Sequence, residues 1–116
     1  MQLDIRRDVQ GSTLVLSGRG EIDLGTLDVL DEELAKAVQD DAQAVVVDLT
    51  GVGFIDSTGL GVLVNAHKRL VAAGKALTLR IVAPSEMLKL FTLTGLDQLF
   101  TIEQVAKGGD AAPSAS

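Results

Sequence analysis

The chain contains no cysteine, tryptophan or tyrosine, and its only aromatic residues are three phenylalanines among 116 residues. The absence of cysteine excludes disulfide bonds, thiol redox chemistry and thiolate metal sites. With so few aromatic rings, stacking platforms for nucleic acid bases or sugars are not expected. The hydrophobic core is therefore expected to consist of leucine, valine, isoleucine and alanine.

Positive charge is also scarce. Ten lysines and arginines stand against sixteen aspartates and glutamates, which gives a formal net charge of −6, and no basic run is longer than a pair such as Arg6-Arg7. Nucleic acids and anionic membrane surfaces select basic patches, so neither is an expected partner.

Long hydrophobic runs are missing as well. No stretch of about 18 consecutive apolar residues occurs, so no membrane-spanning helix and no direct membrane insertion are expected. Asp4, Arg6, Arg7 and Asp8 interrupt the amino terminus, which does not fit a signal peptide. These features predict a cytoplasmic protein.

The hydrophobic content of 47% is typical of a folded domain that needs no disulfide or structural metal. We expect one domain over residues 1–107. The last residues, 108–116, are rich in glycine, alanine and serine and predict a flexible tail.

Apolar periodicity predicts an α/β domain with a mixed, mostly parallel sheet that opens with a β-hairpin. The expected order is strand 3–9, polar turn 10–12, strand 13–17, a glycine-rich acidic loop 18–23, a helix from Leu27 to about Val38, strand 44–49, a helix from Ser57 to about Ala73, strand 76–82, a helix from Pro84 to about Thr92, and a last strand over 99–103.

The helix from Ser57 is expected to bury one apolar stripe against the sheet. The residues expected on this stripe are Leu60, Leu63, Val64, His67, Leu70 and Val71. The residues expected to face outward are Thr58, Gly59, Gly61, Val62, Asn65, Lys68 and Arg69.

The turn between strand 44–49 and this helix is the best candidate for a functional site. The strand is so rich in valine that we expect it to be buried on both faces of the sheet. Asp56 and Ser57 are residues that favour a helix start, because their oxygens accept unpaired backbone N–H groups. Functional groups of open α/β sheets gather at this end of the strands.

The sequence gives little support to a catalytic function of this turn. A serine hydrolase elbow requires a glycine where Ile55 stands. His67, the only histidine, lies roughly 15 Å further along the same helix and cannot act as a base for Ser57 within one subunit. We expect His67 to be a packing residue, and we expect no cofactor.

Metal and nucleotide sites are weakly supported too. Asp23, Asp48 and Asp56 are dispersed in the sequence, and the glycines match no phosphate-binding loop. A phosphoacceptor role for Asp56 of the response-regulator kind needs an acidic metal-binding cluster after the first strand, where this chain has a polar turn.

Two segments carry a resemblance to a known family. The run DLTGVGFIDSTGLG over residues 48–61 resembles the signature of STAS-domain anti-sigma factor antagonists, also called anti-anti-sigma factors. The run GEID over residues 20–23 resembles the second landmark of that family. The similarity extends from residue 3 to about residue 105, with both landmarks in the family's order.

The resemblance implies a STAS fold with four or five strands and about four helices, and a binding function. An unmodified antagonist of this family binds an anti-sigma factor, usually a serine/threonine kinase, and so frees a sigma factor. The kinase phosphorylates the serine after the motif aspartate, here Ser57, and a PPM-type phosphatase reverses the reaction. Asp23, Asp56, Thr58 and Gly59 carry over as partner-contact residues.

Physical chemistry is compatible with this switch. A phosphate on Ser57 is expected to meet the N–H groups of the helix end while adding a charge of about −1.5 to −2 to a contact surface. We expect it to block docking without a large rearrangement. Gly59 and Gly61 leave the first turn without bulk, and Val62 adds an apolar contact for a partner.

Other interpretations stay open at the sequence level. Taken one by one, Asp56 and Ser57 fit a helix cap, and Asp23 fits a cap before the first helix. A STAS subunit of a larger assembly, such as a lipid-transport complex or a sensory scaffold, is the main functional alternative.

Overall fold

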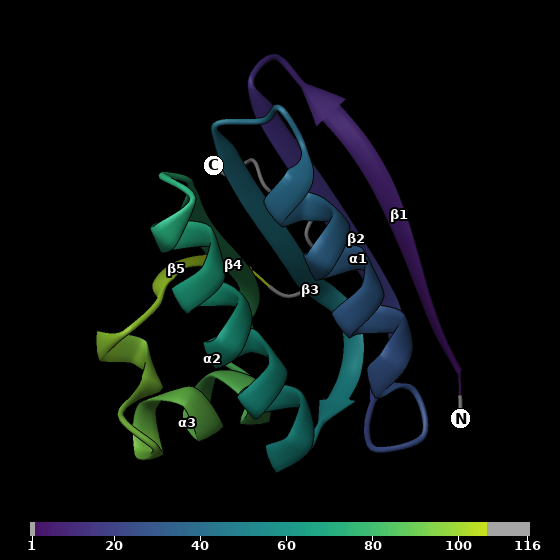
Figure 1. The fold of residues 1–116 in the computed structure, drawn as a ribbon. Helices are drawn as coiled ribbons and strands as arrows, with labels where there is room; N and C mark the ends of the chain where they lie inside the picture. Colours follow the sequence, from purple (N-terminus) through teal and green to yellow (C-terminus); the bar gives the residue numbers. More distant parts are fainter. Residues whose placement is uncertain (1, 107–116) are drawn as a thin grey trace.

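Strands and helices alternate after an opening hairpin (Figure 1), as the sequence predicts. The structure is a computed structural model that describes residues 2–106, so the expected tail over 108–116 lies outside the described residues. The elements are β1 (Leu3–Gln10), β2 (Thr13–Ile22), α1 (Leu27–Gln39), β3 (Ala44–Ile55), α2 (Ser57–Ala72), β4 (Ala76–Ala83), α3 (Glu86–Leu93), the 3-10 turn η1 (Leu96–Gln98) and β5 (Thr101–Ala106).

The five strands form one sheet in the order β1-β2-β3-β4-β5. The β1–β2 pair is antiparallel and the other three pairs are parallel, so the predicted mixed, mostly parallel sheet is confirmed. Each parallel pair is joined through a helix, as parallel connections require. In residues 2–106 there are three α-helices and one 3-10 turn, where about four helices were expected.

The expectation that β3 is buried on both faces is wrong. Figure 1 shows α1 and α2 together on one face of the sheet, and Val45, Val47 and Leu49 of β3 are buried beneath them. On the other face, Asp48 is only half-buried and pairs with Arg80 of β4 at 3.4 Å. The arginine also pairs with Glu103 of β5 at 3.1 Å, so this face carries a polar ladder.

Two strands are longer than the sequence predicts. β2 continues through the expected loop 18–23 to Ile22, and β3 continues past residue 49 to Ile55. The glycines that suggested a loop instead accommodate two register shifts between β2 and β3. Gly20 has φ +119, and a Cβ on it would lie 2.1 Å from the Gln2 carbonyl oxygen.

The buried stripe of α2 differs in part from the expected one. Val71 is 55% exposed, so its expected burial is wrong. Ala66, which was not expected on the stripe, is buried. The buried residues of α2 are Gly59, Leu60, Leu63, Ala66 and Leu70.

The last strand begins later than expected. Gly95 has φ +77 and directs the chain into η1, so β5 starts at Thr101. Phe100, just before it, contacts the rings of Phe91 and His67 edge to face. In residues 2–106, no helix combines the length and apolar character needed to cross a membrane.

Candidate functional site

Asp56 organises the junction between β3 and α2. Its backbone is extended, and its Oδ1 atom accepts hydrogen bonds from the backbone N–H groups of Thr58 at 3.0 Å and Gly59 at 3.1 Å. The Thr58 hydroxyl donates to the same oxygen. These bonds satisfy N–H groups that the first helical turn leaves without a partner, and the predicted helix cap at Asp56 is confirmed.

Ser57 is the first residue of α2 and is exposed. Its hydroxyl makes no hydrogen bond to any side chain or backbone group of residues 2–106, whereas the neighbouring Thr58 hydroxyl is bonded to Asp56. The two adjacent hydroxyls therefore differ in availability. The Ser57 hydroxyl is the one open to a reagent from solution.

The Asp23 segment forms a tight turn before α1. Asp23 Oδ1 accepts from the N–H groups of Gly25 at 2.9 Å and Thr26 at 3.2 Å. The buried Thr26 hydroxyl donates to the Glu21 carbonyl at 2.8 Å. Asp23 was expected to cap α1, but Thr26 occupies that position and makes no side-chain cap bond, so Asp23 stabilises the turn instead.

The two landmark segments are held side by side. Ile22 and Ile55 are paired across β2 and β3, and the Asp56 N–H donates to the Ile22 carbonyl at 3.1 Å. A parallel sheet brings the carboxyl ends of neighbouring strands to one edge, which explains the meeting of Asp23 and Asp56.

Gly59 packs against the end of the sheet at this junction, so its expected outward position is wrong. It is buried, and a Cβ at this position would lie 2.6 Å from the Ile22 side chain and 2.7 Å from the Ile55 side chain. Gly61 is exposed as expected, with no atom within 4 Å of the equivalent position. Val62 was expected to face outward but is half-buried and packs against the core.

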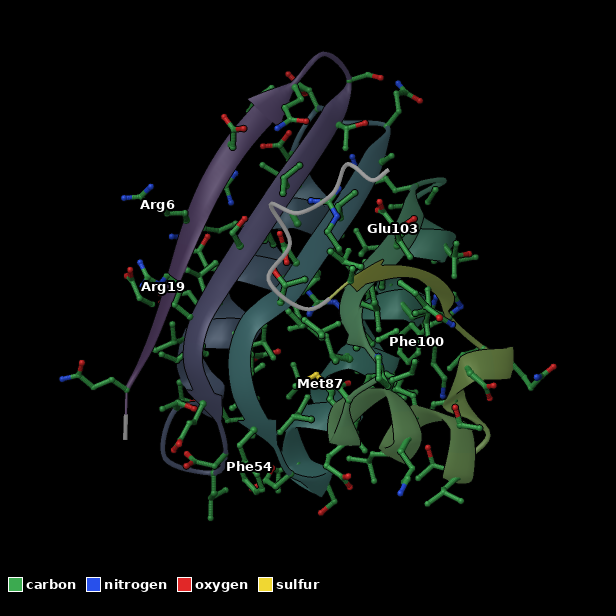
Figure 2. The ribbon with its side chains drawn as sticks, turned by 180° about the vertical axis from the view of Figure 1, so that it is seen from behind. Arg6, Arg19, Phe54, Met87, Phe100 and Glu103 are labelled. Atoms are coloured by element: carbon green, nitrogen blue, oxygen red, sulfur yellow. The ribbon has the colours of Figure 1, made fainter. Side chains whose placement is uncertain are left out.

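Sequence reasoning missed two exposed apolar residues near the ends of β2 and β3. Leu24 follows Asp23 and is 74% exposed, and its backbone N–H lies against the Asp56 carboxylate. Phe54 is 48% exposed at the end of β3 (Figure 2) and is paired with Glu21 of β2. We define the Ser57 surface as Asp23, Leu24, Phe54, Ser57 and Gly61. The sequence did contain a signal for both residues. Leu24 directly follows Asp23, and Phe54 lies within the 48–61 segment, two residues before Asp56.

The pKa of Asp56 is lowered from its ordinary value. The largest cause is the hydrogen bond from the Thr58 hydroxyl, followed by the bond from the Gly59 N–H, since both favour the charged carboxylate. Asp56 therefore remains ionised beside Ser57 at neutral pH.

This shift predicts a pH-dependent effect of Asp56→Asn. A lowered folded-state pKa stabilises the fold above the unfolded pKa, and the contribution is lost as pH falls through the folded value. We expect the variant to melt below the wild type at neutral pH. The difference should shrink below about pH 4, near the ordinary Asp pKa. Thermal melts of both proteins across a pH series measure it, and a constant difference would contradict the assignment.

Within residues 2–106, no histidine lies beside Ser57 to act as its base, since His67 is ten residues further along α2. His67 is half-buried further along α2, and its ring lies edge to face with Phe100 at 5.5 Å between centroids. Its expected role in packing is confirmed by this contact. Among residues 2–106, no three acidic or histidine side chains are placed to hold a metal ion. The junction presents an exposed hydroxyl beside a fixed carboxylate.

Comparisons with known sequences point in one direction. The family model of the STAS domain matches residues 4–107. The anti-sigma-B factor antagonist of Staphylococcus aureus is 33% identical over 105 residues, which cover 90% of this chain and 95% of that protein. The anti-sigma-B factor antagonist of Bacillus subtilis is 34% identical, over 78% of this chain and 81% of that protein.

Solved structures agree in fold. An anti-sigma factor antagonist from Mycobacterium paratuberculosis superposes with a TM-score of 0.80 at 27% identity, covering 88% of this chain and 86% of that one. The antagonist SpoIIAA in its unphosphorylated form gives 0.73 at 19% identity, covering 90% of each chain. Its phosphorylated form gives 0.66 at 21% identity, covering 90% of this chain and 94% of that one.

Proposed function

This chain belongs to the STAS-domain family of anti-sigma factor antagonists, and we propose that its unphosphorylated form binds an anti-sigma factor with serine kinase activity. Binding frees a sigma factor. Phosphorylation of Ser57 by the kinase ends the interaction, and a PPM-type phosphatase restores it. In this proposal the protein acts in the cytoplasm as a ligand and a substrate, without catalysis of its own.

One observation carries the assignment of the acceptor. Ser57 is exposed at the start of α2 and its hydroxyl is free of bonds to residues 2–106, whereas the adjacent Thr58 hydroxyl is bonded to Asp56. A kinase must reach the hydroxyl oxygen of its substrate and remove its proton. Ser57 meets that requirement without loss of the helix cap, and Thr58 does not.

The surroundings of Ser57 support a protein partner. Leu24 and Phe54 expose apolar side chains close in sequence to Asp23 and Ser57, at the ends of the neighbouring strands β2 and β3. Interfaces commonly combine such apolar anchors with polar groups that set orientation. Gly61, one turn after Ser57, leaves room for the approach of a partner's backbone.

A phosphorylation assay tests the acceptor. The protein is incubated with ATP and each candidate anti-sigma kinase encoded near it, and its intact mass is measured. We expect a gain of one phosphate that maps to Ser57. Ser57→Ala should remain unmodified and still bind the kinase, while Thr58→Ala should still be phosphorylated. Modification at Thr58 in the wild type, or recovery of a transporter ATPase and no kinase from cells, would contradict the proposal.

A second prediction concerns Phe54. Phe54→Ala should weaken kinase binding by about tenfold, the effect of losing roughly 1.4 kcal/mol at an aromatic contact. Val71→Ala is the matched control, because Val71 is similarly exposed but lies at the far end of α2. Titration calorimetry with the purified kinase measures both. Equal effects of the two substitutions would remove Phe54 from the interface.

A further inference from the structure

The outer edge of β1 is open for strand pairing. β1 is the first strand in the sheet order, and Figure 1 shows no described element beyond it. The Gln2 carbonyl accepts a hydrogen bond from the Glu21 N–H at 3.0 Å, so even-numbered residues direct their backbone groups toward β2. The residues that direct N–H and C=O groups outward are Leu3, Ile5, Arg7 and Val9.

Arg6 and Asp8 lie on the face of the sheet opposite α1. Their neighbour Arg7 points to the α1 side, where it pairs with Glu33 at 3.2 Å and Asp40 at 3.1 Å, and side chains alternate along a strand. Directly opposite Arg6 and Asp8 on β2 are uncharged residues, Ser17 and Val15.

Neither charge is neutralised within the described sheet. Arg6 is exposed, makes no ion pair with residues 2–106, and extends past the edge of β1 in Figure 2. Asp8 is exposed and accepts one hydrogen bond, from the Gln10 amide at 2.8 Å. Three exposed charges thus alternate along this face of β1, Asp4, Arg6 and Asp8. Asp4 lies opposite Arg19 of β2, whereas Arg6 and Asp8, which have opposite signs and lie two positions apart, face no charge on β2.

We propose that β1 pairs antiparallel with β1 of a second copy of this chain. The twofold axis passes between the two Arg7 residues, so that Ile5 of each copy lies opposite Val9 of the other. Arg6 of each copy then lies opposite Asp8 of the other on the same face of a continuous sheet. Outward backbone groups of Ile5, Arg7 and Val9 form the inter-strand hydrogen bonds.

This register satisfies the side chains on both faces. Arg6 and Asp8 fall at a non-hydrogen-bonded pair, where opposite side chains approach most closely. Val9, which is 66% exposed, gains an apolar neighbour in Ile5. The two Arg7 side chains meet at the axis, but each guanidinium is already held by Glu33 and Asp40 of its own copy.

The opposing interpretation is that these charges prevent edge pairing. Charged residues on an edge strand commonly block association with another strand. That interpretation predicts a monomer whatever the order of the charges. Dimerisation predicts instead that the order of the charges decides the outcome, and charge reversal separates the two.

The test uses the full chain with Arg6→Asp, Asp8→Arg and the double swap. Sedimentation velocity over a concentration series measures the dimer dissociation constant, and circular dichroism checks that each variant is folded. We expect the wild type to dimerise and each single reversal to raise the dissociation constant by about tenfold or more. Mixing the two single variants should restore dimers, because position 6 of each copy then faces the opposite charge at position 8 of the other. The double swap should dimerise like the wild type.

Each other result overturns the proposal. A monomeric wild type at every concentration rules out the dimer. If the dissociation constant is unchanged in both single variants and in the double swap, the dimer forms through another surface. An Asp8→Arg variant that dimerises like the wild type while Arg6→Asp does not would indicate pairing of Arg6 with Asp4, which is a different register. Kinase binding at Ser57 is measured separately on the same variants, since the dimer is proposed independently of the kinase interaction.

Discussion

Replacing Gly59 with alanine is expected to lower the free energy of unfolding by about 1–3 kcal/mol, as overpacking of a tight core does. The added methyl group would lie 2.6 Å from Ile22 and 2.7 Å from Ile55, both buried in the junction between β2, β3 and α2. Either the helix start must move away from the sheet or both isoleucines must shift. Urea unfolding followed by circular dichroism measures the change.

Gly61→Ala is the matched control for this substitution. It lies two residues further along the same helix, is exposed, and has open space where a Cβ would be placed. Alanine favours the helix over glycine by about 1 kcal/mol, so this variant is expected to be as stable as the wild type or more stable. If Gly59→Ala also stabilised the protein, the packing of α2 against Ile22 would not be as described.

Ser57→Asp is expected to weaken binding to the anti-sigma kinase by about a hundredfold, equivalent to a loss of roughly 3 kcal/mol. The reason is the fixed carboxylate of Asp56, which remains ionised beside position 57. A second negative charge there concentrates anionic charge on a surface that the proposed partner binds when Ser57 is uncharged. Affinity of the purified pair, measured by calorimetry at two salt concentrations, checks the effect.

Ser57→Asn separates charge from size in the same position. Asparagine has the shape of aspartate without its charge, so it should bind much closer to the wild type than Ser57→Asp does. Equal weakening by both residues would mean that bulk, not charge, releases the partner. Tight binding by Ser57→Asp would contradict release by phosphorylation altogether.

The structure also revises how a phosphate at Ser57 would be accommodated. The sequence suggested that it would meet the N–H groups of its own helix end. The N–H groups of Thr58 and Gly59 already donate to Asp56. A phosphate therefore has few free donors in its own chain, and we expect it to project toward the partner's side of the surface while the fold keeps its stability.

Features set by neighbouring residues were predictable from the sequence. The start of α2 follows from Asp56 as an acceptor at the helix end. The third helix was expected from Pro84 but begins at Glu86, because the Ser85 hydroxyl accepts from the Leu88 N–H at 3.0 Å and so makes Ser85 the cap. Both signals operate within one helical turn. The order of strands follows from apolar runs separated by turns and helices.

Features set by distant contacts were not predictable in the same way. The glycines of β2 and β3 read as loop residues, because their partners in the sheet lie far away in sequence. Gly59 carries no apolar signal, yet its lack of a side chain is what lets α2 pack on Ile22. The exposure of Phe54 depends on where β3 ends, which no local pattern indicated.

The hydrogen bond from the Asp56 N–H to the Ile22 carbonyl joins the ends of β3 and β2, so the Ser57 surface depends on the order in which the chain folds. The Ser57 surface takes residues from both sides of α1, so it comes into existence only when β3 has crossed over and docked beside β2. Such non-local pairing is slow compared with helix formation. A nascent or partly unfolded chain displays the serine without Leu24 beside it, and a partner that needs both engages only molecules that have finished folding.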